Sequence, residues 1–188
     1  MIKKNLVPII AIVFSAFIIS CSGNSKFKIE KGVVGNVTTK TTIQELSDIF
    51  KNDSIVKNLS EGAQGDNYFQ EDDEYYIFEK GGKLLLTILP KEQLDSTSTI
   101  KSIEIHDARF KTESGININS NFIDINANNN INKIERTFSS ATLFLDNLNT
   151  TITIDNEELG LKEFNTQKVT IEQIPDLAKM KTFIVWFN

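Results

Sequence analysis

The chain has 188 residues, of which 40% are hydrophobic and 24% charged, and a formal net charge of −5. A nucleic-acid partner needs a basic surface, so an acidic chain with Arg109 and Arg136 as its only arginines excludes one. Because Cys21 is the only cysteine and His106 the only histidine, the composition also excludes disulfides within the chain and cysteine-ligated or multi-histidine metal sites.

Residues 1–20 have the layout of a secretory signal peptide. Lys3 and Lys4 precede an apolar run over residues 6–19, which only Ser15 interrupts. A helix needs roughly twenty apolar residues to cross a bilayer, and this run has about fourteen, with Pro8 near its start. The segment therefore predicts export rather than a permanent transmembrane span. Its removal takes away two lysines and changes the net charge from −5 to −7.

The next residues decide between free secretion and anchoring. Ile18-Ile19-Ser20-Cys21 resembles the lipobox, an aliphatic residue three places before a cysteine with a small residue just ahead of it. The resemblance implies that residues 1–20 are removed and that Cys21 is lipidated, with residues 21–26 as the lipidated end and a short tether. Two or more acyl chains make such an attachment effectively permanent, so a membrane is the first expected partner. The alternative is a chance cysteine in an unlipidated signal.

Residues 27–188 predict a single α+β domain with an antiparallel sheet and a few short helices. Thr42 and Glu45 form a capping-box pattern that begins a helix over about residues 42–50. A Gly81-Gly82 turn joins two strands between residues 74 and 90. Pairing about this turn predicts one apolar face, made of Tyr75, Ile77, Leu84, Leu86 and Ile88.

A third strand is predicted over residues 99–110, with Ile103 and Ile105 on one side and polar residues on the other, which indicates a sheet with one wet face. Further on, we expect a hairpin over residues 141–155, turning at 146–149, and a strand near 169–171. The last apolar stretch, residues 183–187, offers no polar face to water, so it predicts a structural strand in the sheet interior, Trp186 included.

A weak internal similarity points to a duplicated helix-plus-sheet unit. Gly35-Asn36-Val37 precedes the first helix, and Gly115-Ile116-Asn117 precedes a shorter apolar pattern at Phe122 and Ile125. Two lobes, about 27–110 and 111–188, are therefore an alternative to one undivided domain.

Side chains with chemical potential are few. His106 follows Glu104 on the polar side of its strand, which favours a solvated side chain over a catalytic base. The acidic run of residues 71–74 lacks the alternating ligands of a calcium loop and indicates a solvated loop. The aromatic residues near it are expected in the core rather than in a binding patch: Tyr68, Phe69, Tyr75 and Tyr76. We therefore expect no catalytic residues, no metal and no cofactor.

The lipobox, the segment 34–38 (VGNVT) before the first helix and the segment 111–116 (KTESGI) together resemble small uncharacterised envelope lipoproteins of Bacteroidota. This resemblance implies an α+β envelope domain. Because no acidic residue lies between Cys21 and Glu30, it also favours an anchor in the outer membrane that faces the periplasm. A helix-then-sheet duplication is similar, by analogy, to the fold of outer-membrane assembly lipoproteins and β-lactamase inhibitor proteins.

Two functions follow as hypotheses. The first is a non-catalytic module that binds an envelope protein or the cell wall. The alternative is a carboxylate-dependent hydrolase that acts on envelope glycans, which would need a pair of acids in a cleft.

Overall fold

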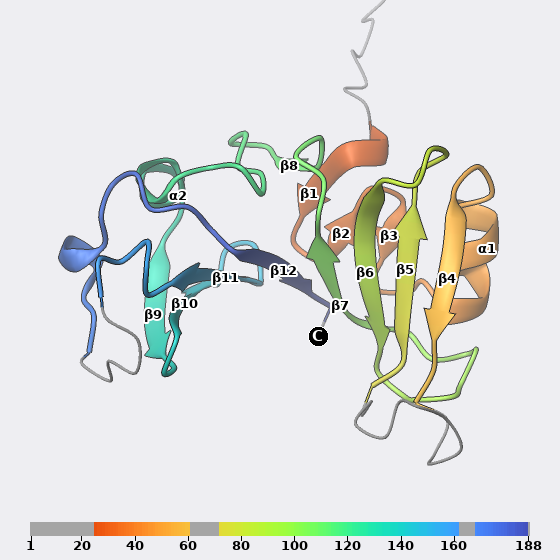
Figure 1. Cartoon of the computed structure of the whole chain (residues 1–188). Helices are drawn as coiled ribbons and strands as arrows, with labels where there is room; N and C mark the ends of the chain where they lie inside the picture. Colours follow the sequence, from red (N-terminus) through yellow and green to blue (C-terminus); the bar gives the residue numbers. More distant parts are fainter. Residues whose placement is uncertain (1–24, 61–71, 162–167, 188) are drawn as a thin grey trace, which may run out of the picture.

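The computed structural model describes residues 25–60, 72–161 and 168–187 (Figure 1). Over these residues the fold is mainly β and almost wholly antiparallel. The described residues form two short α-helices, α1 (Leu46–Ile49) and α2 (Phe122–Asn128), and three 3-10 turns, η1 (Ser25–Phe27), η2 (Ile43–Glu45) and η3 (Ile171–Gln173). The predicted antiparallel sheet with few short helices is confirmed. The helices are so short, however, that the predicted α+β class fits only roughly and the fold is better described as mainly β.

An eight-stranded sheet forms most of the molecule, in the order β4-β5-β6-β7-β12-β11-β10-β9. Every neighbouring pair is antiparallel. Its strands are β4 (Ser54–Asn58), β5 (Glu74–Phe78), β6 (Leu84–Pro90), β7 (Ile100–Ile105), β9 (Ile131–Arg136), β10 (Ser140–Leu145), β11 (Thr150–Asp155) and β12 (Thr182–Trp186).

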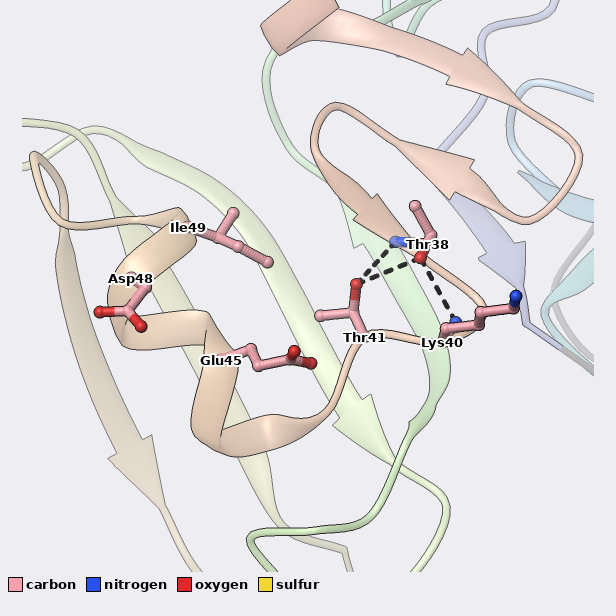
Figure 2. A pocket seen from close by; sticks show the side chains of 6 residues that line it. All are labelled: Thr38, Lys40, Thr41, Glu45, Asp48 and Ile49. Carbon is pink, nitrogen blue, oxygen red and sulfur yellow. Dashed lines mark hydrogen bonds between the residues drawn. The ribbon is translucent and has the colours of Figure 1, made fainter.

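A small second sheet has the order β3-β2-β1-β8. It consists of β1 (Lys28–Glu30), β2 (Val33–Val34), β3 (Val37–Thr38) and β8 (Lys111–Thr112), and β1 pairs with β8 in parallel. Figures 1 and 2 show α1 and the β2-β3 hairpin on the same side of strands β4–β7.

The two halves of the large sheet have matching connectivity. In each half a helix is followed by four strands, α1 by β4 to β7 and α2 by β9 to β12, and the last strands of the two halves pair at the centre. The first helical residues also bond alike: Ile43 N–H donates to the Ser98 carbonyl at 3.0 Å, and Phe122 N–H donates to the Ala178 carbonyl at 2.9 Å. Each acceptor precedes the last strand of its own half.

The large sheet has one buried face and one open face. On the buried face, residues from the central strands have no exposed surface, and α1, α2 and the small sheet contribute to the same core. The central residues of this face are Ile77, Leu86, Ile88, Ile103, Ile105, Leu143, Ile152, Phe183 and Val185. The alternate residues of the same strands form the other face and are mostly half-buried or exposed.

The hairpins lie where the sequence predicts them, with two differences. A register shift between Ile77 and Phe78 pairs Phe78 with Leu84, so Leu84 is half-buried on the open face instead of joining the predicted apolar face. The strand expected near 169–171 is wrong: these residues lead into η3, because the Gln173 side chain accepts the Thr170 N–H at 3.0 Å and starts a helical turn.

Candidate functional site

Several of the residues singled out in the sequence lie outside the described residues. These are Cys21, Tyr68, Phe69 and Glu71. Within the described ranges, Tyr75 lies in the core as expected, whereas Tyr76 is half-buried on the open face. No helix of these ranges combines the length and apolar character that a membrane span requires.

The first described segment, η1, is bound firmly to the domain. Lys26 forms an ion pair with Asp53 at 3.5 Å, and the ring of Phe27 packs edge-on against Phe110, with 5.0 Å between centroids. The guanidinium of Arg109 covers the Phe27 ring. Ser25 and Lys26, which the sequence assigns to the tether, therefore belong to a turn that packs on the fold.

A charged cluster supports Arg109. Its guanidinium donates to both carboxylate oxygens of Glu79, at 2.8 and 2.9 Å, and to both oxygens of Asp107, at 3.0 and 2.9 Å. Lys83 also contacts Asp107, at 2.7 Å. The hydrogen bonds from Arg109, followed by that of Lys83, outweigh burial and hold the pKa of Asp107 well below its usual range. The cluster is structural, since all its charges are paired.

The acidic run is structural as well. Asp73 has no exposed surface, and its carboxylate accepts the Ser60 N–H and hydroxyl at 2.8 and 2.9 Å and the Leu94 N–H at 2.6 Å. Burial alone would raise the pKa of Asp73, but these hydrogen bonds outweigh it and lower the pKa. Asp73 thus joins the segment at Ser60 to the segment at Leu94. The expectation that the whole acidic run is solvated is therefore wrong at Asp73. The described residues hold no group of three or more His, Cys, Asp or Glu side chains placed to bind a metal ion.

A hollow of about 300 Å³ between β3 and α1 contains two acids, as a carboxylate-dependent hydrolase would require (Figure 2). Glu45 and Asp48 point in different directions from the helix. The Glu45 carboxylate accepts the N–H and the hydroxyl of Thr42, at 2.7 and 2.8 Å, which completes the predicted capping interaction and lowers the pKa of Glu45. A general acid of a glycosidase needs a raised pKa, so Glu45 is unsuited to that role.

The other described hollows are small and polar. Two adjoining ones, of about 330 and 350 Å³, share Ser114 and Asn128 and lie between β8 and α2. Asn128 is already bonded to the Asp124 carbonyl at 2.9 Å, and Asn147 to Asn129 at 3.2 Å. A fourth, of about 400 Å³, is lined by the ion pair of Lys181 and Asp155.

The open face of the large sheet has a different character, because large apolar side chains alternate on it with polar ones. Its centre lies where the two halves meet: Glu104 pairs with Ile184, and Ser102 pairs with Trp186. The same row of paired residues continues through Thr87 and Tyr76 on one half and through Thr151 and Phe144 on the other. In the described part of the chain, no helix covers this face. We call these eight residues the open-face centre.

Hydrogen bonds fix three members of the open-face centre, Trp186, Thr151 and Thr87. The Trp186 indole N–H donates to the Thr151 hydroxyl at 3.0 Å, and Thr87 is bonded to the His106 imidazole at 2.8 Å. His106 is therefore half-buried and not simply solvated as expected. Burial lowers its pKa, against the opposing effect of the Glu104 charge, so the ring is neutral at pH 7.

Trp186 is the residue whose position the sequence misses. Its strand, β12, is interior as predicted, between β7 and β11, but the alternation along it buries Phe183, Val185 and Phe187 and leaves Ile184 and Trp186 half-buried on the open face. The fully apolar sequence hides this alternation. The polar alternate residues of the strands on either side, β7 and β11, are the signal that could have revealed it.

Comparison with known proteins gives only a fold relationship. No protein-family model matches the sequence, and no curated protein matches it. The crystal structure of the uncharacterized protein yfeY from Escherichia coli is similar, with a TM-score of 0.53 and 14% sequence identity over 85% of this chain and 99% of that chain. The two chains share a fold over most of their lengths.

Proposed function

We propose that this chain is a lipid-anchored protein of the bacterial envelope, held by Cys21 in the outer membrane on its periplasmic side, and that its domain binds a protein partner through the open-face centre without catalysing a reaction. It would then belong with the small envelope lipoproteins of Bacteroidota that its sequence resembles. The observation that carries the proposal is the face itself. Tyr76, Ile184 and Phe144 lie in one row across the strands, Trp186 lies next to this row on β12, and all four side chains are only half-buried.

The anchor and the domain are close in this proposal. Four residue steps separate Cys21 from Ser25, which allow roughly 14 Å at full extension. Because η1 is fixed by Lys26, Phe27 and Arg109, the domain has little freedom to move away from the bilayer. η1 lies beyond one end of β6 and β7, so the open face would stand beside the membrane surface and stay available to a partner (Figure 1).

The carboxyl groups support a non-catalytic role. Where the pKa of a described carboxyl group departs from its ordinary value it is lowered, as at Asp107, Asp73, Glu79 and Glu45. In each case hydrogen bonds stabilise the charged form. Acid catalysis of glycoside cleavage needs the opposite environment, so no observation here favours the hydrolase.

We further propose that the two halves descend from one duplicated helix-plus-sheet unit. The support is their matching connectivity and matching helix caps: Asn121 and Asp124 occupy in α2 the places of Thr42 and Glu45 in η2. Each cap residue also forms a bridge to the segment before the last strand, Thr42 to Thr99 and Asn121 to Lys179.

The anchor is tested by metabolic labelling with a fatty-acid probe in the native host. Cys21→Ala is expected to lose the label, and Ser22→Ala, the matched control, to keep it. Equal labelling of the wild type and Cys21→Ala would overturn the anchor.

The binding surface is tested by photo-crosslinking in living cells. A photoreactive phenylalanine analogue replaces Phe144, on the open face, or Phe138, which is 66% exposed on the turn before β10. We expect a light-dependent protein adduct from position 144 and none from position 138. An adduct that disappears on peptidoglycan digestion would instead identify a cell-wall partner. A third variant carries the photoreactive residue at Tyr76, on the same face. The binding surface would be overturned if neither position 144 nor position 76 gave an adduct.

A further inference from the structure

We propose that the partner of the open-face centre places a lysine or arginine side chain against Glu104, an inference that rests on the proposed binding function and specifies its chemistry. The proposal rests on the negative charge of the Glu104 carboxylate in this centre. Glu104 is half-buried beside Thr87, Ile184 and His106, and its carboxylate has no hydrogen bond or ion pair within residues 25–60, 72–161 and 168–187.

The other acidic side chains of this face already have partners. Glu135 pairs with Lys133, Asp155 pairs with Lys181, and Glu74 accepts the hydroxyl of Tyr76. The hydrogen bond to Glu74 raises the pKa of Tyr76, and the charge of Glu104 adds a smaller effect in the same direction, so the Glu104 charge acts across the neighbouring strands.

The histidine beside Glu104 does not supply a positive charge that would balance the carboxylate. His106 lies two residues along β7 and bonds to Thr87, and burial lowers its pKa, so the ring is neutral at pH 7. The described lysines of this face are also engaged: Lys133, on the edge strand β9, with Glu135 and the Phe144 ring, and Lys181, just before β12, with Asp155.

Covering this face has a chemical requirement. A partner that packs on Trp186 and Ile184 also removes water from Glu104, which pairs directly with Ile184. A carboxylate that is buried without donors is strongly unfavourable, so a stable complex needs donors at this point, and a cation also balances the charge. The apolar surroundings then strengthen the pair relative to one in water. A lysine or arginine set among apolar residues is therefore the partner chemistry that fits.

The test uses the full mature lipoprotein in detergent micelles and a side-chain mimic as the probe. Butylguanidinium chloride is titrated while NMR follows the Trp186 indole N–H, the only indole in the chain. Neutral butylurea and sodium chloride at equal ionic strength are the controls. We expect a saturable shift with butylguanidinium alone, and binding weaker by about tenfold in Glu104→Gln, the loss expected for one charged hydrogen bond. Glu135→Gln, at the edge of the face, should bind as the wild type does.

Three results would overturn the proposal: no saturable shift, an equal shift with butylurea, or unchanged binding by Glu104→Gln. A fold check by backbone NMR accompanies each variant, and the Glu135→Gln result separates a local effect from a general loss of negative charge. The crosslinking at position 144 is independent of this titration. A protein adduct without guanidinium binding would retain the binding surface and reject only the partner chemistry.

Discussion

The guanidinium carbon of Arg109 lies 4.6 Å from the centre of the Phe27 ring. The same guanidinium bonds both Asp107 and Glu79, so one side chain joins η1 to the segment after β7 and the hairpin of β5 and β6. Stacking of this kind contributes about 0.5–2 kcal/mol. If Cys21 carries the anchor, any force on the tether reaches the domain at this contact.

The first prediction concerns pH and Asp107. Its pKa is lowered in the folded protein, so its stabilising contribution is full above the unfolded value of 3.8 and is lost as the pH falls below that value toward the folded pKa. Asp107→Asn should reduce the free energy of unfolding at pH 7 by about 1–3 kcal/mol, because the side chain is buried and its partners are charged. It should also flatten the loss of stability below about pH 4.

Urea unfolding between pH 2 and 7 measures both effects. Glu79→Gln is the control, since solvent screens this more accessible partner of Arg109 and its loss should cost less stability than that of Asp107. An Asp107→Asn variant with the acid sensitivity of the wild type would contradict the role assigned to Asp107.

The second prediction compares two aromatic residues of β12. Phe183 has no exposed surface, whereas Trp186 is half-buried on the open face. Phe183→Ala should lower the free energy of unfolding by about 3–5 kcal/mol, through lost burial and a cavity. Trp186→Ala should cost less, about 1–2 kcal/mol, since it loses a smaller buried area and one hydrogen bond to Thr151. Chemical denaturation of the two variants measures both losses of unfolding free energy. Equal losses would mean that Trp186 lies in the core.

The third prediction concerns the only histidine. Burial places the pKa of His106 below its ordinary 6.5, and the charge of Glu104 opposes this effect. NMR titration of the imidazole protons should therefore give a midpoint below 6.5, and Glu104→Gln should lower it further. Since the neutral ring is favoured by folding, His106 stabilises the fold above pH 6.5 and this contribution is lost as the pH falls toward the folded pKa. A midpoint above 6.5, or a rise in Glu104→Gln, would contradict the arrangement.

Local patterns in the sequence predict the hairpins, the start of the first helix at Thr42 and the interior position of the last strand. Turn glycines, cap residues and alternation act over a few residues, so they can be seen without a structure. The sequence does not predict the register shift that pairs Leu84 with Phe78, or the two-sided character of β12, which depends on its pairing with β7.

The Arg109 cluster and the open-face centre are hidden for the same reason. Glu79 and Arg109, or Ser102 and Trp186, meet only because distant strands pair in one order. No spacing in the chain encodes such a meeting. Among the residues singled out by sequence, Tyr76 lies in this centre and His106 beside it, but the sequence predicts a core position for Tyr76 and a solvated one for His106.

The last prediction compares two glycines that precede the helices of the two halves. Gly35 and Gly115 both have positive φ, +57° and +86°, so an alanine at either place adopts a strained left-handed conformation. Their surroundings differ. A Cβ at Gly35 would lie 2.5 Å from the carbonyl oxygen of Lys26, whereas a Cβ at Gly115 would meet no atom within 4 Å. Backbone strain alone costs about 1–2 kcal/mol, and the added clash should raise the cost at Gly35 to about 2–4 kcal/mol.

Because the clash at Gly35 is with the backbone of η1, relief requires η1 to move away from the domain. Gly35→Ala should therefore loosen the contact of Phe27 with Phe110 as well as lower the free energy of unfolding. Urea unfolding gives the energies, and amide hydrogen exchange of Gly35, whose N–H donates to the Lys28 carbonyl at 2.7 Å, reports the local loosening. Gly115→Ala should leave that exchange unchanged. If both variants lose the same stability and Gly35→Ala keeps the exchange protection around η1, then η1 is not tightly packed on Gly35, and the short link between anchor and domain loses its structural basis.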